Sequence, residues 1–340
     1  MLKDFKMLRN RLLFIISIAV LIPNLAKAES RSLFTLPLDC VPNVTCFIQN
    51  YVDIDPSENV SDYSCKSATY DGHKGTDFRL LSTQSAIKGV AVIAAASGVV
   101  RAIRDGMNNR LLEDKNNPAI KNRECGNGVV IKHEEGWETQ YCHLKKGSVN
   151  VQKGELISQG EKIGEVGYSG LAQFAHLHLT IRYNGELIDP FTGNIIGASC
   201  SVSQKLDGGL WDKTVSEAFI YRHGEILQSG FSTTVVSIDS LENGDVPQPP
   251  SFSSAPAIIL YARFINLEKG DQVSLEIAGL TGVLVKNITD SLERKKAQYV
   301  TYSGLKRPKN GWAKGKYVGV IKLIREGEVV LSQTQVVEIE

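Results

Sequence analysis

Between residues 71 and 200, apolar residues occur in short runs separated by glycine-containing turns. These runs predict strands at 90–95, 98–103, 128–133, 137–141, 148–152 and 164–167. A Glu-Glu-Gly turn joins the third and fourth runs, as in a β-hairpin. Helical periodicity is nearly absent, so we expect an all-β unit with a mostly antiparallel sheet.

A second block of alternating apolar and polar residues begins near residue 211. It predicts strands at 218–221, 257–264, 273–277, 317–323 and 331–339. This spacing is typical of a β-sandwich of immunoglobulin-like build, although the disulfide signature of immunoglobulin domains is missing. The block contains one histidine, His223, and no catalytic constellation. We therefore expect an accessory module that packs or that binds a protein partner.

The pattern divides the chain into five parts. They are a leader at 1–28, an irregular N-terminal extension with three cysteines at 29–70, the first β unit at 71–200, a linker at 201–210 and the second β unit at 211–340. Inside the first unit, the polar stretch 105–123 lacks a strand pattern. We expect it to form a long surface loop, of a length that often has a function.

The first 28 residues have the pattern of a signal peptide. Four basic residues precede an uncharged apolar run at 12–22, and an Ala-Lys-Ala site ends at Ala28. The run is about half of the roughly 20 residues that a membrane-spanning helix needs, so no stable membrane anchor is expected. We expect cleavage after Ala28 and export to the periplasm or the medium.

Charge excludes one large class of partner. The chain has 38 Lys and Arg residues against 37 Asp and Glu residues. Nucleic-acid-binding proteins usually carry a marked basic excess, so no nucleic-acid partner is expected.

The cysteines indicate disulfide bonds. All six lie beyond the leader, at Cys40, Cys46, Cys65, Cys125, Cys142 and Cys200. An even number in an exported chain favours disulfides over free thiols. Cys125 and Cys142 flank one predicted hairpin and are expected to pair, while the other four allow three pairings. Cys142 could instead bind zinc beside His143, but neighbours on a strand point to opposite faces, which favours the disulfide.

Five of the six histidines fall between residues 73 and 178, in a pattern that indicates metal chemistry. His73 and Asp77 form an HxxxD motif, His143 follows Tyr-Cys, and His176 and His178 form an HxH motif. Residues two apart on a strand share a face, so both histidines of HxH look into the same space. A lone histidine is more often structural. Three patches in this order favour a zinc hydrolase, which needs three protein ligands and an open position for water.

The stretch from residue 71 to about 190 resembles the catalytic domain of lysostaphin-type (LytM-type) zinc metallopeptidases. The matching segments are His-Lys-Gly-Thr-Asp at 73–77, 128–133, Tyr-Cys-His-Leu at 141–144, Gly-Glu-Val-Gly-Tyr-Ser-Gly at 164–170 and His-Leu-His at 176–178. Members of this family are secreted endopeptidases that cut peptide cross-links of bacterial peptidoglycan. The resemblance covers about a third of the chain.

The resemblance implies a role for each residue of the motifs. His73, Asp77 and His178 would hold Zn²⁺, while His143 and His176 would act on water and substrate. Which of these two is the general base stays open. A ligand set of two neutral imidazoles and one carboxylate leaves the zinc site with a net charge of about +1, which favours ionisation of a bound water near pH 7.

His133 and the residues before HxH are not accounted for by this set of roles. His133, on the neighbouring predicted strand, has a structural role or else supports the metal site or the substrate. Gln173-Phe174-Ala175 stands where the family usually has small residues and Gly-Pro before HxH. That departure and the 105–123 loop bear on the shape of the substrate groove rather than on metal binding.

We therefore expect a zinc-dependent endopeptidase that hydrolyses peptidoglycan cross-links through a zinc-activated water, with stem peptides and cross-links as its partners. One alternative is a non-catalytic wall-binding regulator of other hydrolases. Another is a zinc peptidase acting on proteins outside the wall. The bond that is cut, D-alanyl–diaminopimelate or a glycine-containing bridge, stays open from sequence.

Overall fold

A computed structural model describes residues 33–111, 117–197, 209–245, 248–251 and 253–340. They belong to one compact unit. The expected signal peptide, most of the expected linker and Cys200 lie outside the described residues. Among the described helices, none is both long enough and apolar enough to cross a membrane.

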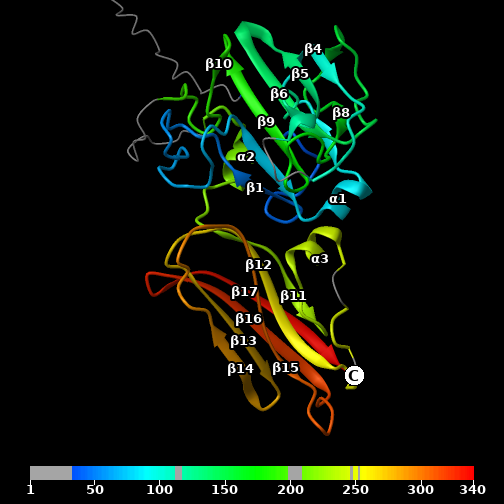
Figure 1. Cartoon of the computed structure of the whole chain (residues 1–340), viewed down its shortest axis with the longest axis vertical. Helices are drawn as coiled ribbons and strands as arrows, with labels where there is room; N and C mark the ends of the chain where they lie inside the picture. Colours follow the sequence, from blue (N-terminus) through cyan, green and yellow to red (C-terminus); the bar gives the residue numbers. More distant parts are fainter. Residues whose placement is uncertain (1–32, 112–116, 198–208, 246–247, 252) are drawn as a thin grey trace, which may run out of the picture. The chain divides into compact units, whose positions relative to one another are not determined.

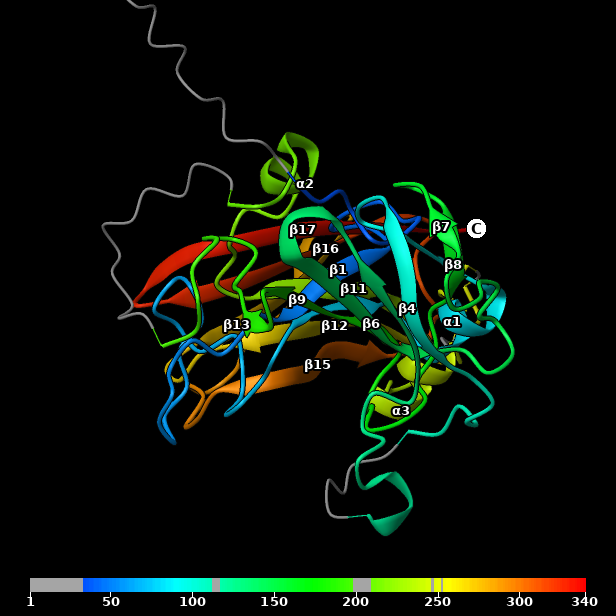
Figure 2. The same ribbon diagram turned by 90° about the horizontal axis from the view of Figure 1, so that it is seen from above.

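An antiparallel sheet forms the first half of the molecule (Figure 1). Its strands are β1 (Cys46–Asn50), β2 (Thr76–Leu80), β9 (His176–Tyr183), β6 (Trp137–Leu144), β5 (Asn127–Lys132), β4 (Gly98–Arg104) and β7 (Leu156–Ile157), in that spatial order, with β10 (Glu186–Leu187) paired to β9. Figure 2 shows β9 and β6 side by side near the middle. β3 (Ala91–Ile93) and β8 (Lys162–Glu165) form a separate pair. The expected all-β, antiparallel unit is confirmed.

The alternation of β9 explains how the sheet keeps one face for chemistry. Leu177, Leu179 and Ile181 are buried in the first hydrophobic core, whereas His176 and His178 lie on the opposite face. This arrangement follows from the period of two in a strand. The apolar positions of β2, β5 and β6 fill the same core.

Residues just after the expected linker also belong to this first core. Trp211, Val215 and Phe219 are buried in it, on and around helix α2 (Lys213–Ala218). The strand predicted at 218–221 is wrong, because the chain here forms this helix and then coil. The Asp212 side chain accepts a hydrogen bond from the amide of Val215 and so caps the helix. The capped helix thus extends into the first residue of the predicted strand, and Phe219 packs into the first core instead of joining a sheet.

The predicted strand at 148–152 is also wrong. The amide of Ser148 donates to the Lys145 carbonyl, and the amide of Val149 donates to the Asp105 carboxylate. These bonds are those of a turn rather than of a strand ladder. β4 ends at Arg104, and the described parts of the 105–123 stretch contain no strand. Their one regular element is a short 3-10 turn, η1 (Pro118–Ile120), in line with the expected loop.

The second half contains two sheets that share a core. One has the order β11 (Glu225–Ser232), β12 (Ala257–Leu267), β15 (Lys296–Lys306), and the other β14 (Gly282–Ile288), β13 (Gln272–Gly279), β16 (Gly315–Arg325), β17 (Glu328–Ile339). Leu260, Leu275 and Ile321 contribute to one buried cluster from both sheets. A sandwich is therefore present, and its immunoglobulin-like build stays a prediction.

Three short helical segments complete the described elements. Helix α1 (Thr83–Lys88) follows β2, and helix α3 (Ile238–Asn243) lies between β11 and β12. The two helices contact each other where the halves meet (Figure 1). The 3-10 turn η2 (Glu134–Gly136) joins β5 to β6.

The disulfide expectation is confirmed at its most specific point. Cys125 bonds to Cys142, and Cys40 bonds to Cys46. Cys65 is disulfide-bonded as well. Cys142 therefore has no thiolate for a metal, as the sequence favoured.

Candidate metal centre

Pairing between strands brings the HxxxD and HxH motifs together. Asp77 on β2 lies opposite His178 on β9 in the antiparallel register. Asp77 lies on β2, whereas His73 lies in the irregular segment that precedes this strand. Gly75 makes the path of this segment possible, because a Cβ there would lie 2.5 Å from the Leu179 carbonyl oxygen and 2.6 Å from the His178 ring. The segment thus passes directly against β9.

Three potential ligand atoms converge at this point. His178 Nδ1 lies 2.8 Å from Asp77 Oδ1, His73 Nε2 lies 3.1 Å from Asp77 Oδ1, and the two histidine nitrogens are 3.2 Å apart. A tetrahedral zinc ion with ligands at 2.0–2.1 Å would separate its ligand atoms by about 3.3 Å. The three residues form a group that could hold a metal ion. Their spacing and their His-Asp-His chemistry both fit zinc.

Each of the three side chains also contacts a polar group outside the cluster. His73 Nδ1 donates to the Tyr51 carbonyl oxygen at 2.6 Å, which directs Nε2 towards Asp77. Asp77 Oδ2 accepts a hydrogen bond from the side-chain amide of Asn50, with 2.8 Å between Nδ2 and Oδ2. His178 Nε2 lies 3.1 Å from the Thr180 hydroxyl. Such outer contacts fix the orientation of metal ligands and tune their basicity.

His176 lies beside the cluster. Its Nδ1 donates to the Phe174 carbonyl oxygen at 2.9 Å, and its Nε2 lies 3.6 Å from Asp77 Oδ1. Its ring centroid is 4.5 Å from that of His143. Because Nδ1 carries the proton, the free lone pair of His176 is on Nε2.

His143 reaches the same space through an unusual backbone conformation. It has a φ of 64° at the end of β6, in the left-handed region that side chains rarely adopt. Its amide donates to the Cys125 carbonyl, and its Nδ1 donates to the Ser169 carbonyl oxygen at 2.8 Å. The strand alternation that was expected to separate Cys142 from His143 is therefore broken at His143 itself.

Electrostatics differ among the five residues. Burial raises the pKa of the Asp77 carboxyl, but the His73 and His176 charges and the hydrogen bonds from His178 and His73 hold that pKa well below its usual range. Burial lowers the pKa of His73, yet attraction and hydrogen bonding to Asp77 leave it raised. Burial lowers the pKa of His176 and, with repulsion from His176 and His178, holds that of His143 well below its usual range. Asp77 is thus ionised at neutral pH, and His143 and His176 are neutral.

Comparison with known proteins finds a family match over the region that contains this cluster. The model of Peptidase family M23 matches residues 71–190. These residues are an M23 peptidase domain. The match covers about a third of the chain. It contains the three potential ligands and the two neighbouring histidines, which together we call the M23 cluster: His73, Asp77, His143, His176 and His178.

Relatives of the M23 domain come from several bacteria. The peptidoglycan DD-endopeptidase ShyA of Vibrio cholerae is 33% identical over 133 residues, which are 39% of this chain and 25% of that protein. An uncharacterized metalloprotease of Haemophilus influenzae is 29% identical over 131 residues, 38% of this chain and 23% of that protein. This chain therefore spans about a quarter of the length of these relatives.

Solved structures that match part of the chain include the catalytic domain, in a mutant form, of the prophage-encoded M23 protein EnpA from Enterococcus faecalis. It is 20% identical, has a TM-score of 0.29, and the match covers 42% of this chain and 90% of that one. A zinc-containing peptidase from Vibrio cholerae is 22% identical with a TM-score of 0.29, and the match covers 45% and 41%.

The other two histidines lie apart from the M23 cluster. His133 Nδ1 donates to the Ser97 carbonyl oxygen, and its Nε2 lies 2.8 Å from the Thr139 hydroxyl. Burial lowers the pKa of His133, so this side chain is neutral. Both ring nitrogens are thus engaged by protein groups. His223 is partly exposed and lies 3.4 Å from Glu268.

Sequence reasoning missed several residues around the M23 cluster. Asn50 and Tyr51 support it from the N-terminal extension, which had no recognisable pattern. Tyr70 places its ring 4.5 Å from that of His73. An aromatic residue three positions before the HxxxD motif was the only signal for Tyr70. Asn50 and Tyr51 gave none, because they reach the site only through the pairing of β1 with β2.

Proposed function

We propose that this protein is a zinc-dependent endopeptidase that hydrolyses peptide cross-links of bacterial peptidoglycan. The observation that carries the proposal is the convergence of His73 Nε2, Asp77 Oδ1 and His178 Nδ1 within 3.2 Å of one another. Relatives named peptidoglycan DD-endopeptidases support the substrate class. They make D,D-cross-links the first bond to test and an exported or envelope location the expected one.

In the proposed mechanism, His73, Asp77 and His178 hold the metal. Zinc, when bound, supplies a Lewis acid that acidifies water and polarises a carbonyl. The Tyr51 carbonyl and the Asn50 amide keep His73 and Asp77 oriented for this task. Burial of the Asp77 carboxylate reduces screening by solvent and strengthens its attraction for a cation.

His143 and His176 move the proton. Both rings donate Nδ1–H to a backbone carbonyl and keep a lone pair on Nε2. One Nε2 would take the proton of the attacking water, and the resulting imidazolium would stabilise the oxyanion that develops on the scissile carbonyl, while the neutral second ring would orient the water. The proton then passes to the departing amine. Neutral imidazoles near pH 7 suit this cycle.

The test is the variant His143→Ala in the full chain. We expect cleavage of purified peptidoglycan to be lost while about one equivalent of zinc stays bound, because His143 is not one of the three ligands. His223→Ala, which removes a partly exposed histidine elsewhere, is the matched control and should keep both properties. Full activity of His143→Ala would refute the assignment.

Two further outcomes decide between the proposal and its alternatives. A wild-type protein that binds walls, cleaves nothing and holds less than about half an equivalent of zinc would be a wall-binding regulator. Cleavage of a protein panel but not of isolated sacculi would indicate a peptidase acting outside the wall. Mass spectrometry of the muropeptides released from walls of different cross-link chemistry identifies the bond.

A further inference from the structure

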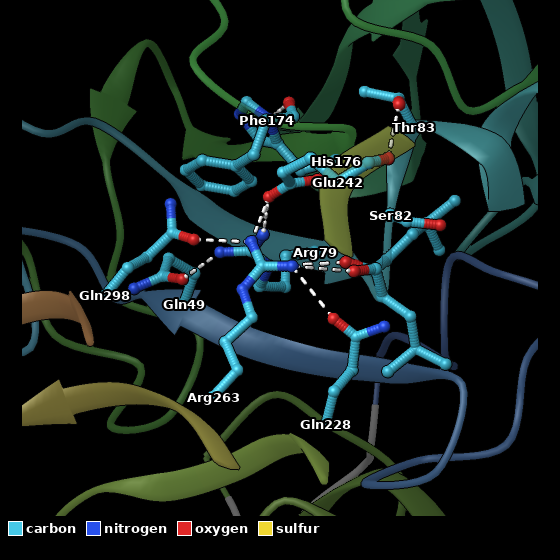
Figure 3. Close-up of polar contacts among 12 residues, drawn as sticks. Gln49, Arg79, Ser82, Thr83, Phe174, His176, Gln228, Glu242, Arg263 and Gln298 are labelled. Carbon is cyan, nitrogen blue, oxygen red and sulfur yellow. Dashed lines mark hydrogen bonds and ion pairs between the residues drawn. The ribbon is translucent and has the colours of Figure 1, made fainter. Parts of the chain in front are cut away.

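A buried charged cluster lies where the M23 domain meets the C-terminal half. It consists of Arg79 on β2, Glu242 on α3 and Arg263 on β12, and all three side chains are buried (Figure 3). Glu242 Oε1 accepts a bond from Arg79 Nη2 at 2.5 Å and another from Arg263 Nη2. One carboxylate thus serves two buried guanidinium groups.

No other carboxylate among the described residues pairs with either arginine. The remaining partners of the two guanidinium groups are neutral: the side chains of Gln49, Gln228 and Gln298 and the carbonyl oxygens of Leu80 and Leu81. Burial and the neighbouring arginine lower the pKa of Arg79 to about 10, although Glu242 opposes this shift. Glu242 is therefore the group that makes a charged Arg79 tolerable at this position.

Arg79 connects the charged cluster to the metal centre. It lies two residues after Asp77 and opposite His176 in the β2–β9 register. Its guanidinium carbon lies 4.4 Å from the ring centroid of Phe174. The Phe174 ring is in turn 4.5 Å from the His176 ring, and the Phe174 carbonyl is the acceptor of the His176 Nδ1 proton. The contacts therefore run in series from Glu242 through Arg79 and Phe174 to His176 (Figure 3).

The contacts between Arg79, Phe174 and His176 suggest a role for Phe174, a residue that departs from the family pattern. Gln173-Phe174-Ala175 replaces the small residues expected before HxH, and Phe174 is the ring that Arg79 covers. A small residue there would have no aromatic face for the guanidinium. Phe174 and the Arg79–Glu242 pair are thus two parts of one arrangement.

We propose that Glu242 of the C-terminal half is a positioning residue for His176, acting through Arg79 and Phe174. The catalytic consequence rests on the function proposed above, whereas the positioning itself does not. Glu242 fixes the plane of the Arg79 guanidinium, and that plane fixes Phe174. The Phe174 ring and carbonyl then hold the imidazole of His176 in the tautomer with a free Nε2. The C-terminal half is therefore part of the catalytic apparatus rather than an appended module.

Kinetics of three variants test the proposal in the full chain. Glu242→Gln, Arg79→Lys and Phe174→Leu should each lower kcat by about tenfold or more with little change in KM, as for other residues that orient a site from behind. Arg79→Lys is informative even if Glu242→Gln fails to fold, because lysine keeps the ion pair but lacks the flat guanidinium that covers Phe174. Three variants with wild-type kcat would overturn the proposal.

A matched control separates positioning from loss of stability. Asp271 is fully buried and accepts two bonds from Arg325, at 2.7 and 2.8 Å, within the C-terminal half. Asp271→Asn breaks a buried ion pair without touching the series, so it should leave kcat unchanged. The double variant Glu242→Gln/Phe174→Leu should be no slower than the slower single variant, because both changes act on one path. Multiplying effects would instead mean two independent structural defects and would overturn the proposal.

A second readout does not depend on activity. Long-range ¹H–¹⁵N correlation spectra of histidine-labelled protein, with His176 assigned by His176→Asn, report which ring nitrogen carries the proton. We expect Nδ1–H in the wild type and in Asp271→Asn, and a mixture of tautomers in Glu242→Gln and Arg79→Lys. An unchanged Nδ1–H signal in both variants would overturn the positioning role. If the wild type cleaves no peptidoglycan but the tautomer shifts as expected, the proposed function fails and the positioning stands.

Discussion

Asp77 and Arg79 lie two residues apart on β2, and both are fully buried. The Asp77 carboxylate lies against ring nitrogens of His73 and His178, and these three residues could hold a metal ion. The Arg79 guanidinium is balanced by Glu242, which lies 163 positions further along the chain. The two sites thus place opposite charges side by side in one strand, and each requires a different source of compensation.

The difference shows which part of the molecule can change its state. The proposed metal ion would exchange with solvent, so the Asp77 site would have a loaded and an empty condition. Glu242 cannot leave without local unfolding, so the Arg79 site has a single folded condition. Four predictions test this contrast, ordered by the size of the expected effect.

The largest effect is expected from Asp77→Asn. The substitution keeps the shape of the side chain but removes the charge that attracts the cation. We expect zinc content and peptidoglycan cleavage both to fall by well over the roughly 10–100-fold that outer contacts contribute. Elemental analysis of the purified protein measures the first quantity. Asp271→Asn, which removes another buried carboxylate, should keep its zinc.

The second effect concerns the fixed site. Glu242→Ala leaves two buried arginines unpaired, and we expect it to lower the free energy of unfolding by about 3–5 kcal/mol. The triple variant Arg79→Met/Glu242→Leu/Arg263→Met removes every charge and should recover wild-type stability within about 1 kcal/mol. Urea denaturation measures both. A triple variant as unstable as Glu242→Ala would mean that packing, not charge, dominates here.

The third effect concerns the disulfide beside His143. The variant Cys125→Ala/Cys142→Ala opens a link across 17 positions, and we expect a loss of about 3 kcal/mol of stability. Cleavage should fall as well, because the Cys125 carbonyl holds the His143 amide in its left-handed conformation. The control is Cys40→Ala/Cys46→Ala. This disulfide links residues only 6 positions apart, and it does not adjoin His143. Equal loss of cleavage in both variants would contradict this role.

The smallest effect is expected at Asn50. Its amide donates to Asp77 Oδ2, so Asn50→Ala should weaken zinc binding by about 10–100-fold with little change in stability. Competition with a zinc chelator of known affinity measures this change. Asn43→Ala removes an amide of the same extension that bonds to the Ala218 carbonyl, and it should leave zinc affinity unchanged. A shared loss would indicate that the extension as a whole, not the Asn50 amide, controls the site.

The sequence predicted those features that depend on near neighbours. The alternation of His176, Leu177, His178 and Leu179 was enough to place two histidines on one face of a strand. The pairing of Cys125 with Cys142 followed from a hairpin. Such features need only the period of the strand and a short turn.

The sequence could not predict what depends on distant pairing or on a single torsion. The left-handed φ of His143 has no signature, because histidine usually avoids that region. Asn50 reaches Asp77 only through the register of β1 on β2. Glu242 reads as one surface acid of a short helix, and only the tertiary fold brings it to Arg79. The misassigned strand at 218–221 has β-prone residues, but helix α2 covers its first position and Phe219 packs into the first core.

The pairing of β1 with β2 also has a practical consequence for any attempt to excise the matched region. A fragment cut at the limits of the family match, residues 71–190, would discard Asn50 and Tyr51 at one end and Trp211 and Glu242 at the other. It would expose a bare strand edge on β2, which is prone to associate with other chains. A fragment that keeps the contacts of the metal centre must therefore be longer than the family match, because it includes the flanks on both sides.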